Sequence, residues 1–347
     1  MALLRNARSP IGLDVGRRKI KAVQLNRGSA GWRVSAAASL PRAPGQPAVV
    51  PSEVRRLREE LAARGFKGHS VVLAVPPESV LSGIMELPPA DSGAPMEILA
   101  RAELGRIHKC DPQSLEMSCW TLPAPARAAN TTFVMGVACT HADANGLLDT
   151  FEAEGFDVER LDVQIAALAR TCRPLLKDAP GTAGVLDLGW TAARLVLMYR
   201  GTVVYERKLA RSGLQGFVRA LADRGRLTEE QVEQRLAAEG ASLDLPDRSG
   251  RPMGTDLAGQ FLDGLVDEMR VPLSYSANQY PDAALARLLL VGGGAKLPGL
   301  ADHLAAALAC PVRGVLPSDL AAGAESLGPE HGSELTMALG LGQMDEV

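Results

Sequence analysis

The sequence predicts an α/β fold built from two related lobes, and three observations support this. Residues 11–28 (IGLDVGRRKIKAVQLNRG) align without gaps with residues 184–201 (GVLDLGWTAARLVLMYRG), about half a chain further on. A glycine turn at 292–294 follows a short apolar run and precedes leucines at helical spacing. The length of 347 residues suits two domains, because domains usually hold roughly 100–200 residues.

The composition excludes several classes of protein. Hydrophobic residues make up 46% and charged residues 22%, so the chain can bury a core and is not a disordered or fibrous protein. The 37 Lys and Arg against 40 Asp and Glu leave no basic excess for nucleic acid. Five scattered cysteines without a CxxC predict neither a zinc site nor a disulfide framework. Without a long apolar run or a signal peptide, we expect a cytoplasmic protein.

Each copy of the repeat predicts a β-hairpin that turns at an Asp-x-Gly motif. The first copy places Asp14 and Gly16 at this turn, and the second places Asp187 and Gly189 there. A further strand follows in each copy, at 31–37 and 201–209. A tight turn lets backbone N–H groups face an anion, and the Asp beside it can meet a metal ion or its water shell. Two such turns facing each other could hold a polyphosphate.

The glycine turn predicts a third part of a nucleotide site. A buried strand at 288–291 leads into Gly292–Gly293–Gly294, and Pro298 suits the first turn of the helix that follows. A strand, a glycine turn and a helix N-terminus together form a natural nucleotide site. The alternative is a tight strand-to-helix connection without a ligand.

Other segments predict helices and loops between these motifs. We expect Ser52 to cap a helix that buries Val54, Leu57 and Leu61, followed by a strand at 71–75 and a helix at about 94–107. Thr228 and Gln231 predict a capping box. After an expected loop at 241–254, a long helix would turn inward the apolar side chains of Leu257, Phe261, Leu265 and Met269, with a kink at Pro272.

The three motifs together resemble the actin-like ATPase superfamily, and within it the PilM family of type IV pilus assembly proteins. The resemblance rests on residues 12–25, 184–213 and above all 288–308 (LLLVGGGAKLPGLADHLAAAL), with a lobe-crossing segment at 151–168. It implies a two-lobed, ribonuclease H-like fold of four subdomains. Subdomain 1A would take residues 8–75 and 161–180, the 1C insertion 76–160, subdomain 2A 181–220 and 285–347, and subdomain 2B 221–284.

The resemblance also implies ATP and Mg²⁺ as ligands. Asp14 and Asp187 would hold Mg²⁺ through water, and Asp187 with Gln164 would serve any hydrolysis. The nucleotide contacts would come from the two turns and the glycine segment, namely Asp14, Gly16, Arg17, Arg18, Lys19, Asp187, Gly189, Thr191, Gly213, Gly292, Gly293, Gly294 and Lys296. Gln164 could instead be an ordinary polar residue between the lobes.

The first turn departs from the family pattern. Small hydroxyl residues are usual after Asp-x-Gly, but Arg17, Arg18 and Lys19 stand there, and only Thr191 keeps a hydroxyl in the second turn. The three cations could contact a triphosphate directly, or their bulk could fill the space of the phosphates. We expect nucleotide binding to be retained, and at most slow ATPase activity.

The expected partner is the cytoplasmic tail of a PilN-like inner-membrane protein, bound in a groove between subdomains 1A and 1C. The motor ATPases of the pilus would be further neighbours, and the chain would reach the inner membrane only through partners. The segment 107–120 lacks the family's aromatic and proline pattern and carries His108 and Cys110, which predict a loop rather than a metal site. The alternatives are a small-molecule kinase on the same fold, or a cytoskeletal or division protein like MreB or FtsA.

Overall fold

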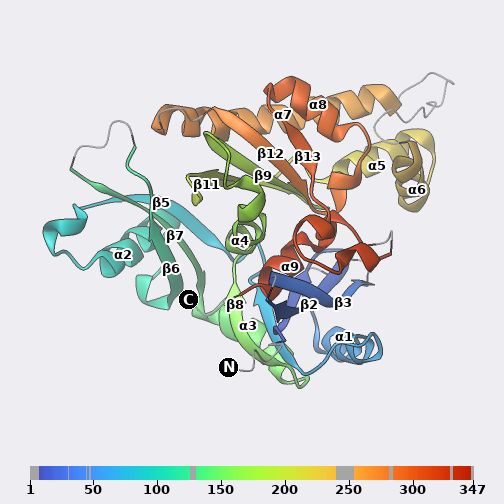
Figure 1. Cartoon of the computed structure of the whole chain (residues 1–347), viewed down its shortest axis with the longest axis horizontal. Helices are drawn as coiled ribbons and strands as arrows, with labels where there is room; N and C mark the ends of the chain where they lie inside the picture. The colour runs from blue at the N-terminus through green and yellow to red at the C-terminus, as the bar shows by residue number, and fades with distance from the viewer. Residues whose placement is uncertain are drawn as a thin grey trace.

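The computed structural model describes residues 8–29, 31–43, 45–46, 48–125, 130–239, 254–280, 284–328 and 331–344. Two five-stranded sheets and one three-stranded sheet form the framework, with helices packed on them. Figure 1 shows the first lobe around β2, β3 and α1, the second lobe around β9, β12 and β13, and α4 between them. The fold is therefore α/β with two lobes, as the sequence predicted.

The first lobe contains a sheet in the order β3-β2-β1-β4-β8. Its strands are β1 (Ile11–Val15), β2 (Lys19–Gly28), β3 (Gly31–Pro41), β4 (Ser70–Ala74) and β8 (Asp157–Asp162). β1 runs antiparallel to β2 and parallel to β4. Helices α1 (Pro51–Ala63) and α3 (His141–Glu152) contribute to its core, where Leu57 and Phe151 are buried together.

The second lobe repeats this sheet in the order β11-β10-β9-β12-β13. Its strands are β9 (Thr182–Leu188), β10 (Ala193–Tyr199), β11 (Thr202–Leu209), β12 (Leu285–Val291) and β13 (Val312–Gly314). The pairing Val15↔Ile20 in the first hairpin recurs as Leu188↔Ala193 in the second. Since these are the positions that the sequence repeat aligns, the two lobes share one strand plan.

Two helices join the lobes at the centre of the molecule. Helix α4 (Gln164–Leu176) follows β8, the last strand of the first sheet, and α9 (Thr336–Gly342) comes after β13, the last strand of the second. The helices pack closely: a Cβ atom added at Gly340 would overlap the backbone of Ala167. Both helices bring buried apolar residues to one continuous core, Leu168 from α4 and Leu341 from α9.

A small insert lies between β4 and α3. It holds β5 (Leu81–Leu87), α2 (Met96–His108), β6 (Leu115–Thr121) and β7 (Thr132–Thr140), with the strands in the order β5-β7-β6 (Figure 1). Although the first lobe's chain encloses it, the insert packs on the second lobe, whose core includes its Met135 and Val137. The indole Nε1 of Trp120 donates to the carbonyl oxygen of Val203 on β11 at 2.8 Å.

Further helices belong to the second lobe: α5 (Leu214–Gly225), α6 (Glu229–Glu239), α7 (Gly254–Gln279) and α8 (Leu300–Leu308). The capping box is confirmed, because Gln231 N–H donates to Thr228 Oγ1 at 3.2 Å and Thr228 N–H donates to Gln231 Oε1 at 2.9 Å. In α7, Leu265 and Met269 are fully buried as expected. The helix continues through Pro272.

Several local expectations need correction or lie outside the described residues. α1 begins at Pro51 with Val50 as its N-cap, so Ser52 is not the cap, because proline at the first helical position fixes the start one residue earlier. Pro298 precedes α8, whose N-cap is Gly299. The loop expected at 241–254 falls almost entirely outside the described residues. The subdomain boundaries stay a prediction.

A helix that crosses a bilayer must be long and apolar. Within the residues that the structure describes, every helix is too short or too polar to span one.

Candidate functional site

The two hairpin turns face each other between the lobes. In the first, Gly16 N–H donates to the carbonyl oxygen of Lys19 at 3.0 Å, and in the second, Gly189 N–H donates to that of Ala192 at 3.2 Å. The guanidinium carbon of Arg18 lies 4.2 Å from the ring centroid of Trp190 in the opposite turn. Its charge also pairs with Glu233 on α6. The repeat therefore produces two turns of one geometry, and Arg18 of the first turn contacts Trp190 of the second.

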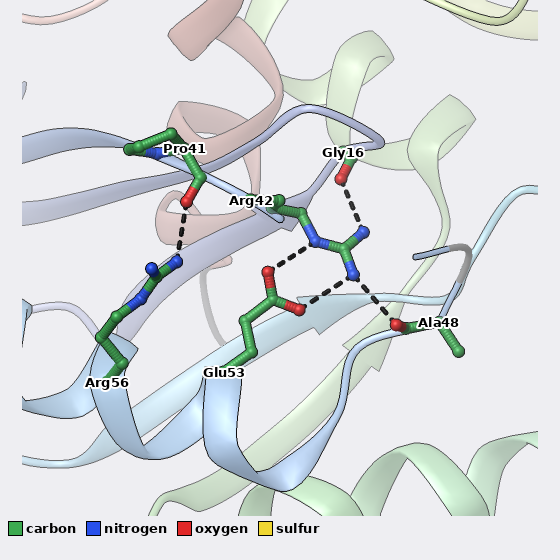
Figure 2. Close-up of polar contacts among 6 residues, drawn as sticks. All are labelled: Gly16, Pro41, Arg42, Ala48, Glu53 and Arg56. Atoms are coloured by element: carbon green, nitrogen blue, oxygen red, sulfur yellow. Dashed lines mark hydrogen bonds and ion pairs between the residues drawn. The ribbon is translucent and has the colours of Figure 1, made fainter. Parts of the chain in front are cut away.

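A buried arginine holds the first turn in place (Figure 2). Arg42 Nη1 donates to the carbonyl oxygen of Gly16 at 2.9 Å, while Nε and Nη2 donate to the two Glu53 carboxylate oxygens, each at 2.9 Å. Nη2 also reaches the carbonyl oxygen of Ala48 at 3.0 Å. The Arg42 and Glu53 side chains are only 1% and 6% exposed. Such a forked pair fixes orientation as well as distance, so it sets where the first turn stands.

The second turn is held by a helix end instead. Leu214 N–H and Gln215 N–H, at the start of α5, donate to the carbonyl oxygens of Gly189 and Trp190 at 3.2 and 2.8 Å. These N–H groups have no partner within their own helix, so the turn satisfies them. The N-cap is Gly213, and a Cβ atom there would overlap the backbone of Thr191. Gly213 thus allows α5 to approach the turn.

A carboxylate stands beside each turn, and a cation lies opposite each carboxylate. Asp14 pairs in register with Lys21 across β1 and β2, and Asp187 pairs with Arg194 across β9 and β10. Lys21 Nζ forms an ion pair with Asp14 Oδ2 at 2.7 Å. The sequence repeat aligns Lys21 with Arg194, so it duplicates the cation along with the Asp.

The carboxylates lie close enough to perturb ionisation. Burial, together with the nearby Asp14 charge, raises the pKa of Asp187 to about 6, although Lys21, Arg194 and the hydrogen bond from Gln164 lower it. Burial alone would lower the pKa of Lys21, but the charges of Asp14, Asp187 and Glu334 and the hydrogen bond to Asp14 raise it above its usual value. The site therefore holds the carboxylates of Asp14 and Asp187 close together. Lys21 and Arg194 are the cations that face them.

Gln164 connects the lobe-crossing helix to the second carboxylate. It is the first residue of α4, and its Nε2 donates to the Asp187 carboxylate while its Oε1 accepts from Arg194 Nε at 2.9 Å. Its neighbour Asp162 has a structural role, since it accepts from Val163 N–H at 2.7 Å and pairs with Arg170 at 3.0 Å.

The glycine segment lies against the same carboxylate. Gly292 has φ +83°, and a Cβ atom there would collide with Asp187 Oδ1 and lie 2.9 Å from the carbonyl oxygen of Leu188. Glycine is required here for both reasons. The segment continues as a short 3₁₀ helix, Gly293–Lys296, whose Lys296 pairs with Glu334 at 2.9 Å.

The donor set suits Mg²⁺ carried by a nucleotide better than a metal held by protein alone. Among the residues that the structure describes, no group of three or more His, Cys, Asp or Glu side chains could hold a metal ion. Mg²⁺ usually binds one or two carboxylates and takes its remaining ligands from phosphate and water. Asp14 and Asp187 supply two such carboxylates, and a divalent cation would offset both the burial and the nearby Asp14 charge that raise the pKa of Asp187.

The structure brings the predicted site residues together at the two facing turns and the glycine segment beside Asp187, although their contacts differ. The side chains of Arg17, Lys19 and Thr191 are exposed, and Arg17 pairs with Glu78 at 3.2 Å. The sequence reasoning missed Lys21, Arg42, Arg194 and Glu334. A charged residue inside each apolar hairpin strand, at aligned positions of the repeat, was the signal for Lys21 and Arg194.

Comparison with known proteins places this arrangement in a family. A solved PilM–PilN type IV pilus biogenesis complex contains a chain 24% identical, with a TM-score of 0.78, covering 96% of this chain and 97% of that one. The ethanolamine utilization protein EutJ from Carboxydothermus hydrogenoformans is 14% identical with a TM-score of 0.57, covering 98% and 90%. MreB5 of Spiroplasma citri bound to AMPPNP is 12% identical with a TM-score of 0.51, covering 95% and 93%.

These likenesses confirm the actin-like ATPase fold. No curated protein is similar enough in sequence to count as a relative. The sequence model of the family described as "Type IV pilus assembly protein PilM" matches residues 12–342, which is nearly the whole chain. The chain therefore belongs to the PilM family of type IV pilus assembly proteins.

Proposed function

We propose that this protein binds ATP with Mg²⁺ between its two lobes and works as a scaffold in type IV pilus assembly. The observation that carries the proposal is the pair of facing turns, each with its own Asp, beside a glycine segment pressed against Asp187. Membership of the PilM family supplies the cellular process. MreB5, which shares the fold, was solved with an ATP analogue.

The phosphates would lie between the turns at Gly16 and Gly189. Gly292–Gly294 and Lys296 would face the nucleoside end, and Asp14 and Asp187 would hold Mg²⁺ through its water shell. Arg17, Arg18 and Lys19 lie at the first turn, and a polyanion there would compete with Glu78 and Glu233 for the two arginines. When bound, Mg²⁺ would neutralise phosphate charge, while Arg42 and α5 keep the two turns in position.

Hydrolysis would be slow at most. In related ATPases a polar side chain near the position of Gln164 orients water, but here both ends of the Gln164 amide are already bonded, to Asp187 and Arg194. Orienting a water would require the amide to leave at least one partner, which adds to the barrier. The nucleotide would therefore act mainly as a bound ligand.

The partner would be the cytoplasmic tail of a PilN-like inner-membrane protein. The solved PilM–PilN complex, whose chain matches this one over nearly its full length, supports that choice. An extended peptide in a groove between subdomains 1A and 1C would bind by backbone pairing and apolar pockets. The protein would then lie at the cytoplasmic face of the inner membrane through this partner, with the pilus motor ATPases as further neighbours.

Titration with Mg²⁺ and AMPPNP in a calorimeter tests the ligand. We expect saturable binding by the wild-type chain and its loss in Asp187→Ala, with binding unchanged in Asp178→Ala, whose side chain is exposed. A wild-type chain that releases no heat would contradict nucleotide binding. Capture of a PilN-like protein from detergent-solubilised membranes tests the partner independently, and recovery of no inner-membrane protein would contradict the scaffold.

A further inference from the structure

A chain of polar contacts leads from the nucleotide site into the insert. Gln164 Nε2 donates to the Asp187 carboxylate, and Arg194 Nε donates to Gln164 Oε1 at 2.9 Å. Arg194 Nη1 pairs in turn with Glu206 Oε2 on β11. The other oxygen of Glu206 accepts from Ser82 Oγ on β5 of the insert. These side chains thus join Asp187 to a strand that lies far earlier in the sequence.

The middle of this chain is an ion pair sealed from water. The side chains of Arg194 and Glu206 are 9% and 8% exposed. They lie diagonally across neighbouring strands, since Arg194 is in register with Lys208, two residues after Glu206. A buried pair is costly to break, so its two partners move together rather than separately. A shift of the Arg194 guanidinium is therefore passed to Glu206.

The far end of the chain is a polar attachment of the insert to the second lobe. Ser82 reaches Glu206, and nearby Trp120 Nε1 donates to the carbonyl oxygen of Val203 at 2.8 Å. Inside the insert, His108 Nε2 donates to the carbonyl oxygen of Ser82 at 2.9 Å, at the end of α2. Ser82 therefore connects Glu206, which its hydroxyl contacts, with His108 of α2, which contacts its carbonyl oxygen.

We propose that Gln164, Arg194, Glu206 and Ser82 couple occupancy of the nucleotide site to the docking of the insert on β11. The inference rests on the proposed function, because it needs a Mg²⁺–nucleotide at Asp187. That ligand would compete for the carboxylate oxygen that Gln164 now binds. The Gln164 amide then has two arrangements, one with and one without its bond to Asp187. A ligand that favours one of them also shifts the position of Arg194, to which the amide is bonded, and through Arg194 that of Glu206.

The size of the coupling follows from the bonds involved. The loss or gain of a single hydrogen bond at the Ser82 end of this series of contacts corresponds to a change of ~2–10-fold in nucleotide affinity. Reciprocity requires the same factor to appear when the insert's contact is removed. Ser82→Ala removes that contact and leaves the Arg194–Glu206 pair and every nucleotide-site residue in place.

The test follows both ends of this series of contacts, the nucleotide site and the insert, in one sample. The full-length protein is labelled with 5-fluorotryptophan, and ¹⁹F resonances of its three tryptophans are assigned by Trp→Phe variants. During titration with Mg²⁺ and AMPPNP, Trp190 reports on the second turn and Trp120 on insert docking. Ser118→Ala is the matched control, because Ser82 on β5 and Ser118 on β6 both pair with Val137 of β7.

In the wild type and in Ser118→Ala we expect both resonances to move with one apparent Kd. In Ser82→Ala we expect Trp190 to move with a Kd changed ~2–10-fold, while the movement of Trp120 falls by at least half. A Trp120 resonance that stays still while Trp190 moves in the wild type would overturn the coupling. So would a Ser82→Ala protein that behaves as wild type. If neither resonance moves and no heat is released, nucleotide binding itself fails, and the coupling fails with it.

Discussion

Asp187→Asn is expected to stabilise the ligand-free protein at neutral pH while removing its function. In the folded protein, burial and the Asp14 charge raise the pKa of Asp187 from 3.8 to about 6. Above pH 6 the carboxylate is charged in both states, and keeping that charge in the folded protein is unfavourable. At about 1.36 kcal/mol per pKa unit, the difference corresponds to ~3 kcal/mol. Asparagine is neutral at every pH and avoids this cost.

The sign of the pH dependence gives the sharper test. Near pH 4 the folded wild type keeps Asp187 protonated, and the unfolded chain is about half protonated, so the two proteins should differ little. As the pH rises from 4 through 6, the folded state binds more protons at this site than the unfolded state, and wild-type stability falls relative to the variant. The gap should reach its full ~3 kcal/mol by pH 7.5 and stay constant above it.

Urea unfolding followed by far-ultraviolet circular dichroism, at pH 4.5 and 7.5, measures the gap. Asp178→Asn removes one exposed negative charge and serves as the control. A gap of equal size at both pH values would refute the reasoning, as would a variant less stable than wild type at pH 7.5. Addition of Mg²⁺ and AMPPNP should raise the unfolding midpoint of the wild type but not that of Asp187→Asn, because only a ligand bound to the folded state stabilises it.

Three further predictions concern the framework of the site. Gly292→Ala should abolish AMPPNP binding in calorimetry and lower the melting temperature, because its Cβ would collide with Asp187, whereas Gly146→Ala on α3, away from the site and with open space around it, should leave binding unchanged and should not lower the melting temperature. Arg42→Met should cost ~3–5 kcal/mol in urea unfolding by stranding the buried Glu53 charge, and the double variant with Glu53→Leu should recover most of that loss. Arg18→Ala should change the free energy of unfolding by about 1 kcal/mol or less, because its partners are half-exposed; a larger loss would mean that the bridge between the turns holds the lobes together.

The lobes could be predicted from sequence because their signals are local and occur twice. An Asp-x-Gly turn between apolar strands needs only neighbouring residues to specify it, and the second copy, half a chain away, excluded coincidence. The same local logic found the capping box at Thr228 and the buried face of α7 around Leu265. Strand β12 and its glycine turn were predicted for the same reason.

The contacts that hold the site could not be predicted from the sequence, because they join elements that lie far apart in it. Glu53 resembles any surface carboxylate on the first turn of a helix until the fold brings Arg42 against it, and only then does the pair hold the Gly16 turn. Gln164 was predicted to lie near the site, but its two partners come from β9 and β10. The charge run at 17–19 was expected either to contact a triphosphate or to fill the place of the phosphates, and its ion pairs could not be foreseen: Arg17 pairs with Glu78 and Arg18 with Glu233. Side-chain pairing of this kind depends on tertiary packing, which no local pattern encodes.

The position of the insert also bears on how the chain folds during synthesis. Strand β11 is the edge strand of the second sheet, and an uncovered edge strand invites pairing with other chains. Its cover, which includes Trp120, leaves the ribosome before β11 does, because the insert precedes it in the sequence. The aggregation-prone edge is thus guarded from the moment it forms, and a chain that lost the insert would lose this protection along with its docking contacts.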